Sequence, residues 1–416
     1  MKLQITNLGM IEQGEIALDK NLIVLTGPNH SAKSQLAYLL YGLLKVKHAK
    51  ASNLLYEKYK NLLYQHFDQA NILAKYTTKT GISVNLPAFY QENSELYTKV
   101  HNQTLVSSLV EVFASKYLCP DIQLVDNPKN PLLNTEYTDI VKLNGVSYHY
   151  QLNNEWFEFN SDEHQTDNLA FIKPYFYEAV TLSNNFNVYF FPAERLALNI
   201  LSKEVVRERA LERDDLSRRI LANENLETVI KSLQQKGSLV PCYPLAVNDY
   251  IYFIDDLIYI GRNISEYAFL ADEIENNLIQ GKILLSEHGS LKYKINQQRM
   301  PMHLAASLVK SLAGLVVYFR HIAQKNDVIM LDEPELNLHP NNQIQIAHIL
   351  AKAVTKGFKV ILSTHSNYII QEFKNLLMQN NSQNPDSLNP TEVDVYFCNE
   401  NSIMSVTEKS FVLEIN

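Results

Sequence analysis

A short segment near the N-terminus has residue types that can bind phosphate. The letters GPNHSAKS place Gly27, Lys33 and Ser34 at the spacing of the phosphate-binding pattern G-x-x-x-x-G-K-[ST]. In such a loop backbone N–H groups surround phosphate oxygens, the lysine contacts the terminal phosphates and the hydroxyl binds Mg²⁺. Ala32 stands at the position of the second glycine. The candidate nucleotide-binding residues are Gly27, Pro28, Asn29, His30, Ser31, Ala32, Lys33, Ser34 and Gln35.

Two later segments add acids and a histidine, each at the end of an apolar run. The letters VIMLDEPE put Asp332 and Glu333 where open parallel sheets bind their ligands. One acid there can hold Mg²⁺, and its neighbour can orient an attacking water. The letters LSTHS put His365 where it can hydrogen-bond to a terminal phosphate or to that water. Alone, each has an ordinary explanation, such as a helix cap or a polar loop residue. Their order after Lys33 and Ser34 favours a nucleotide-hydrolysing site.

The elements around these motifs predict an α/β sheet. An apolar strand ends at Thr26, before the loop, and a helical pattern follows Ser34. In the last third a buried strand ending in acids, a helix stopped by Gly357 and a second buried strand follow in close succession. This order implies parallel pairing with a right-handed crossover. Residues 303–324 predict a long helix, and residues 393–398 and 403–408 predict edge strands.

The middle of the chain contains no recognisable motif. Residues 142–160 alternate like a strand pair around Asn144-Gly145, and residues 282–295 predict a hairpin around His288-Gly289. Residues 202–233 form a charged helical stretch of mixed sign, which favours a solvated helix face over a partner-binding arm.

Composition narrows the class of protein. A chain of 416 residues with 46% hydrophobic and 20% charged residues predicts a soluble globular protein of two lobes, or one domain with large insertions. The formal net charge of −8 argues against a general nucleic-acid binder, although a local basic patch stays open. Three separated cysteines argue against a zinc site or a disulfide framework. No apolar run is long enough for a membrane span and the start lacks a secretory signal, so we expect a cytoplasmic protein.

Together the motifs resemble a known group of ATPases. The segments GPNHSAKS, LDEPELNLHP and LSTHS resemble the ABC-type ATPase heads of RecF, SMC, Rad50 and the overcoming-lysogenization-defect (OLD) proteins. The chain is most similar to stand-alone bacterial AAA-family ATPases of the AAA15/AAA21 kind, whose other motifs recur here as FFPAERL and SLVKSL. The resemblance covers roughly residues 1–45, 186–200 and 300–416.

The resemblance implies a fold and a division of the chain. The expected fold is an ABC-type P-loop ATPase head, a mixed and largely parallel sheet flanked by helices, with antiparallel N-terminal strands and large, mainly helical insertions. The expected parts are residues 1–45 (head, with the P-loop), 46–185 (insertion of helix and strand), 186–200 (head strand), 201–299 (helical insertion) and 300–416 (head, with the signature-like helix, the acidic strand and the switch histidine).

The resemblance also implies roles for individual residues. Lys33 would bind the β- and γ-phosphates of ATP, and Ser34 and Asp332 would hold Mg²⁺. Glu333 would position the attacking water, and His365 would be the switch histidine. The implied catalytic residues are therefore Glu333, His365 and Lys33.

In such heads ATP lies between two subunits, and a signature serine from the partner contacts the γ-phosphate. The candidate is Ser307 in HLAASLVKSL, for which an ordinary helix N-cap is the alternative. The segment lacks both glycines of the ABC signature L-S-G-G-Q. The letters NLHP after Glu335 would be the D-loop. A glutamine equivalent to the Q-loop is not evident, and Glu194 or Arg195 is the candidate substitute.

Three functions compete. The first is a cytoplasmic ATPase that dimerises on ATP and acts as a switch, in anti-phage defence with a separate effector such as a nuclease or toxin. The second is a DNA-repair or chromosome ATPase of the RecF or SMC kind, which predicts strongly salt-dependent DNA binding. The third is a scaffold that binds ATP without hydrolysing it. Because a decayed site should also have lost Glu333 or Lys33, we interpret the Ala32 loop as functional. Left-handed backbone at Ala32 would cost about 1–2 kcal/mol relative to glycine.

Overall fold

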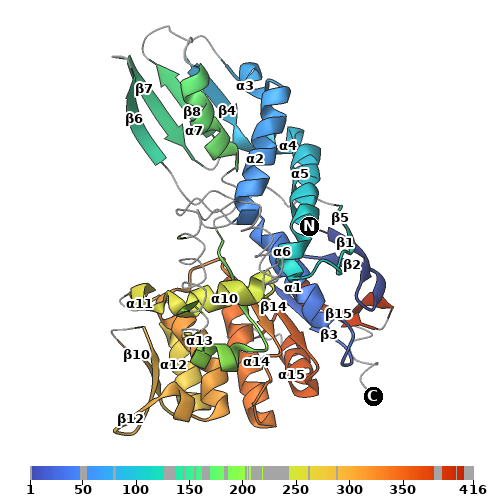
Figure 1. Cartoon of the computed structure of the whole chain (residues 1–416), viewed down its shortest axis with the longest axis vertical. Coiled ribbons are helices and arrows are strands. Elements are labelled where there is room, and N and C mark those ends of the chain that lie inside the picture. Colours follow the sequence, from blue (N-terminus) through green and yellow to red (C-terminus); the bar gives the residue numbers. More distant parts are fainter. Residues whose placement is uncertain are drawn as a thin grey trace. The chain divides into compact units, whose positions relative to one another are not determined.

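The computed structural model describes residues 2–46, 54–77, 81–125, 137–143, 146–153, 156–161, 169–181, 186–201, 204, 206–207, 218, 243–260, 263–286, 289–378, 387–399 and 401–406. These residues form two compact units (Figure 1). Unit 1 comprises residues 1–4, 43–108 and 122–186, and unit 2 comprises residues 5–42, 109–121 and 187–416. Most of the charged stretch 202–233 and the turn at Asn144-Gly145 lie outside the described residues.

Unit 2 is built on a large sheet. Its strands lie in the order β5 (Asp121–Leu124), β1 (Lys2–Leu8), β2 (Ile11–Ala17), β16 (Ser402–Val406), β15 (Val393–Cys398), β3 (Leu22–Thr26), β14 (Lys359–Thr364), β13 (Val328–Asp332) and β9 (Val188–Phe191). Residues of β5 and β1 are shared with unit 1. The five strands from β15 to β9 are parallel to one another. The two-residue connection between β1 and β2 requires an antiparallel pair, and β15 pairs antiparallel with β16. The predicted mixed, largely parallel sheet is confirmed.

The central strands are buried because helices flank them. All five residues of β3 and of β13 are buried, as expected for parallel strands covered on both faces. The helices of this part are α1 (Lys33–Lys45), α13 (Ser307–His321), α14 (Pro340–Thr355) and α15 (Asn367–Met378). The order β13, α14, β14 confirms the predicted parallel crossover, and Gly357 follows α14 in left-handed backbone (φ 94°).

The described part of residues 201–299 shares the core of the sheet. Its elements are α10 (Leu245–Asp255), α11 (Leu257–Ile260), α12 (Ala268–Glu273), a π-helix (Ile274–Ile279), β10 (Lys282–Leu285), β11 (Leu291–Ile295) and β12 (Gln298–Pro301). One hydrophobic cluster joins Tyr250 of α10 and Leu270 of α12 with Leu22 of β3 and Leu350 of α14. The predicted hairpin β10–β11 is confirmed, and β12 is a third strand that the sequence analysis missed.

Unit 1 combines helices with a four-stranded sheet in the order β4-β8-β7-β6. Its elements are α2 (Leu54–Gln69), α3 (Ile72–Lys75), β4 (Gly81–Asn85), α4 (Leu86–Glu92), α5 (Ser94–Ser107), β6 (Tyr137–Leu143), β7 (Val146–Leu152), β8 (Trp156–Ser161) and α7 (Leu169–Thr181). Strands β6, β7 and β8 are antiparallel, which confirms the pairing predicted from alternation. Buried aromatic rings, among them Phe67, Phe89 and Phe176, form its core. Over the residues described in either unit, no helix is both long and apolar enough to cross a bilayer.

Candidate nucleotide-binding site

The loop between β3 and α1 has the backbone of a phosphate cradle. Gly27, His30 and Ala32 have positive φ angles of 142°, 68° and 59°. A Cβ atom on Gly27 would lie 2.1 Å from the carbonyl oxygen of Cys398, so only glycine fits there. Ala32 adopts the left-handed backbone, and its carbonyl accepts the N–H of Leu36 (2.9 Å) in the first turn of α1. Alanine at this position therefore adopts the left-handed backbone that the pattern usually assigns to glycine.

Lys33 is buried at the centre of this loop. Its Nζ donates to the carbonyls of Gly27 (2.9 Å) and Pro28 (2.7 Å) and to Ser31 Oγ (3.3 Å). Burial lowers the pKa of Lys33, and the acidic groups around it, Glu333 among them, oppose that shift. The ammonium group is therefore held inside the loop that would surround the phosphates.

The loop meets the acidic strand at Ser34. The Ser34 Oγ donates to Asp332 Oδ1 (3.2 Å), although the two residues are 298 positions apart in the sequence. Ser363 on the neighbouring strand β14 hydrogen-bonds to the same carboxylate oxygen. A hydroxyl and a carboxylate side by side supply the hard oxygen ligands that Mg²⁺ prefers, so the residues present fit that ion.

Glu333 follows the strand in a strained conformation. Its φ is 47°, which is uncommon for a residue other than glycine, and its N–H donates to the Ser363 carbonyl (3.0 Å). The pKa of Glu333 is raised, first because the side chain is partly buried and then because the Asp332 carboxylate lies nearby. A raised pKa suits a carboxylate that accepts a hydrogen bond from a reacting water.

His365 lies beside two acids. Its Nδ1 is 3.8 Å from Glu333 Oε1 and 3.5 Å from Glu335 Oε1. Glu335 is buried, and its Oε1 accepts the Thr364 hydroxyl (2.8 Å) and the His365 N–H (2.9 Å). Sequence reasoning assigned Glu335 no role, although it is the last acid of the DEPE segment. It links the end of β13 to the loop after β14.

The other predicted residues differ in exposure and in what they contact. Pro28, Asn29 and His30 are exposed, Ser31 is buried, and Gln35 lies against the turn at Gly9. Ser307 is exposed as the first residue of α13, whose N-cap is Ala306, so the N-cap explanation for Ser307 is not met. Within the described residues no hydrogen bond or ion pair connects Ser307 to Lys33 or Asp332. Glu194 is exposed, and Arg195 is buried against the end of β13.

A parallel sheet, a loop of the P-loop pattern before α1 and a contact between its serine and an acid at a strand end are typical of P-loop nucleotide-binding proteins. Residues 1–370 match the family model described as AAA ATPase domain, and the chain belongs to that family. None of the curated proteins matches this chain.

Solved structures similar to this chain include two SMC heads. The Smc head domain of Pyrococcus furiosus, with an extended coiled coil and bound to the C-terminal domain of ScpA, has 11% identity and a TM-score of 0.35, covering 99% of this chain and 97% of that one. The SMC head domain from Thermotoga maritima has 10% identity and a TM-score of 0.30, covering 98% and 97%.

Proposed function

We propose that this protein is a Mg²⁺-dependent ATPase that hydrolyses ATP as a molecular switch. The observation that carries the proposal is the contact between Ser34 Oγ and Asp332 Oδ1, 3.2 Å apart, beside the buried Lys33 ammonium. If the segment matched the P-loop pattern only by chance, nothing would require its hydroxyl to lie against a carboxylate 298 residues later in the sequence. Membership of the AAA ATPase domain family supports the same function.

The residues have separate roles in this proposal. Ser34 and Asp332 would hold Mg²⁺, which would neutralise charge on the phosphates. Lys33 would exchange its hydrogen bonds to the loop carbonyls for bonds to the β- and γ-phosphates. Glu333 would orient the attacking water, and His365, between two carboxylates, would hydrogen-bond to that water or to the γ-phosphate.

We further propose that two heads dimerise around ATP. Ser307 is exposed at the start of the 15-residue helix α13, where its hydroxyl and the free N–H groups of the first turn can meet a partner's γ-phosphate. The resemblance to AAA15/AAA21 proteins supports a cytoplasmic role in anti-phage defence, with a separate nuclease or toxin as effector.

The test combines ATP hydrolysis with particle mass by light scattering, for the wild type and Glu333→Gln. We expect turnover in the wild type, and in the variant at least 100-fold slower turnover with a dimer that persists in ATP. Glu12→Gln, an exposed acid of β2, is the matched control and should behave as the wild type does. ATP binding without turnover in the wild type would refute hydrolysis and leave a nucleotide-held scaffold.

A further inference from the structure

The Arg195 side chain is buried at the end of the acidic strand, and its partners are unusual. It is 3% exposed, yet each hydrogen bond described for it goes to a backbone carbonyl. The nitrogen Nη1 donates to Pro192 O (2.9 Å) and Asp332 O (2.7 Å), Nη2 donates to Glu333 O (2.8 Å), and Nε donates to Ser311 O (3.2 Å). A buried charge is costly, so a guanidinium kept here indicates a specific requirement.

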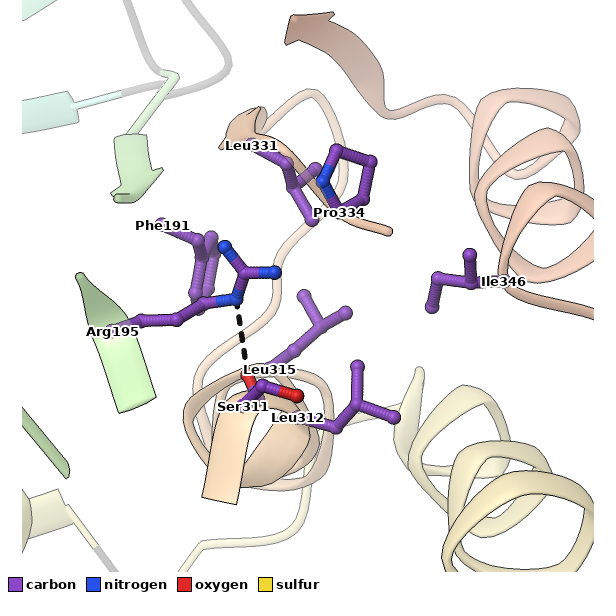
Figure 2. Close-up of a pocket in the computed structure, with 8 residues that line it drawn as sticks. All are labelled: Phe191, Arg195, Ser311, Leu312, Leu315, Leu331, Pro334 and Ile346. Carbon is purple, nitrogen blue, oxygen red and sulfur yellow. Dashed lines mark hydrogen bonds between the residues drawn. The ribbon is translucent and has the colours of Figure 1, made fainter. Parts of the chain in front are cut away.

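These carbonyls belong to three different elements. Pro192 follows β9, Asp332 ends β13 and Glu333 follows it, and Ser311 is in the second turn of α13. Figure 2 shows the guanidinium between Phe191 and Pro334, with Nε directed at the Ser311 carbonyl. Its planar fork of donors matches this arrangement, which a single ammonium group could not reproduce.

The contact with Glu333 explains how its backbone is held. Left-handed backbone at Glu333 persists only if the surroundings fix it from both sides. Its N–H is bound by the Ser363 carbonyl (3.0 Å), and its carbonyl is bound by Arg195 Nη2 (2.8 Å). Since these two peptide groups flank the Glu333 Cα, they set the direction in which its carboxylate leaves the chain.

The same guanidinium reaches the helix of Ser307. Ser311 lies one turn after Ser307 on α13, so Arg195 joins that helix to the Glu333 backbone through one rigid group. We propose that Arg195 is a positioning residue that holds Glu333 in register with helix α13, and so couples the partner-facing end of the head to the water-orienting carboxylate. This inference rests on the proposed function for the roles of Glu333 and Ser307.

Asn199 provides a matched control. It lies one turn after Arg195 in the helical segment 195–201, is also buried, and donates to α13 through the carbonyl of Lys310 (2.6 Å). The contacts described for its side chain go to Lys310 and Tyr250, not to the end of β13. Asn199→Ala therefore weakens the contact between segment 195–201 and α13 without removing the hydrogen bond to the Glu333 carbonyl.

The experiment compares Arg195→Lys and Arg195→Met with Asn199→Ala, measuring kcat, KM, melting temperature and amide hydrogen exchange over residues 328–336. We expect kcat to fall at least 30-fold in both Arg195 variants with KM within threefold. Exchange over 328–336 should rise at least tenfold in them and not in Asn199→Ala. Lysine keeps the charge and most of the volume, so Arg195→Lys should fold even where the methionine variant does not.

The outcomes separate this inference from the proposed function. An active wild type with Arg195→Lys within threefold of its kcat would overturn the positioning role and leave the ATPase proposal standing. An equal loss of kcat in Asn199→Ala would reduce Arg195 to a general packing role. If the wild type hydrolyses no ATP, the proposed function fails. Unchanged hydrogen exchange over residues 328–336 in Arg195→Lys would then overturn the positioning role of Arg195. A rise in Arg195→Lys that is absent in Asn199→Ala would support it.

Discussion

Replacing Ala32 by glycine tests whether left-handed backbone at this position costs the loop only a small strain energy. Ala32 has φ 59°, and glycine would relieve about 1–2 kcal/mol of left-handed strain. Against this, glycine gives the unfolded chain more freedom, which costs about 0.4–1 kcal/mol. Loss of the half-buried methyl group costs about 0.4 kcal/mol more. The free energy of unfolding should therefore change only by about −0.4 to +1.2 kcal/mol.

The affinity for ATP should hardly change in Ala32→Gly. The loop already has the cradle conformation, with Ala32 O accepting the Leu36 N–H, so the strain at Ala32 is present before and after binding. A term that is equal in the free and bound states cancels in the binding free energy. We expect a Kd within threefold of the wild-type value.

The assays are urea denaturation and titration with a fluorescent ATP analogue, and Ala32→Val is the contrast. A β-branched side chain is an outlier in left-handed backbone. The Ala32→Val variant should therefore be at least about 1–2 kcal/mol less stable than the wild type. Equal stability of the glycine and valine variants would refute left-handed backbone at Ala32. A tenfold tighter Kd in Ala32→Gly would show that the loop rearranges on binding.

Three further predictions follow from other contacts. Gly27→Ala should lose about 2–4 kcal/mol of stability and its ATP binding, because the new Cβ would lie 2.1 Å from Cys398 O; a variant that melts and binds like the wild type would contradict this. Asp332→Asn should slow turnover at least 100-fold and raise the Mg²⁺ concentration for half-maximal rate, as a metal titration would show. Burial lowers the pKa of Lys359 from 10.5 to about 8, so the folded protein binds fewer protons than the unfolded chain between these values. Its free energy of unfolding should then rise across pH 8–10.5 by up to about 3 kcal/mol relative to Lys359→Met; a constant difference in urea midpoints would contradict this.

The fold was predictable where hydrophobic pattern and length agree. Strands β3 and β13 read as continuous apolar runs because both of their faces are buried, and α14 has the length of one crossover. Strand β12, Gln298–Pro301, was missed because its residues are exposed or half-buried and show no apolar alternation. The shared core of α10 and α12 with the sheet could not be predicted either, because periodicity identifies an apolar face but not its partner.

The site was predictable only as far as its motifs reach. Spacing selected Lys33, Ser34 and Asp332 as candidates, since phosphate and Mg²⁺ need those groups in that order, and the structure brings Ser34 within 3.2 Å of Asp332. Spacing did not predict that Arg195 binds backbone carbonyls. Every residue has a carbonyl group, so such a partner cannot be recognised from residue types. Nor did spacing show that Glu335 links Thr364 to His365, since that contact depends on the register of β13 and β14.

The charges at this edge of the sheet form one connected set. Two buried cations, Lys33 and Arg195, lie among the carboxylates of Asp332, Glu333 and Glu335, and all three carboxylates favour the charged form of both cations. If all five groups are charged, three negative charges face two positive ones. Burial first, and then the neighbouring Asp332 carboxylate, raises the pKa of Glu333. The one carboxylate in excess favours a cation over a bare anion at this edge. Such a site disfavours free polyphosphate and suits a nucleotide that arrives with its magnesium ion, which is the charge balance that the proposed ATPase requires.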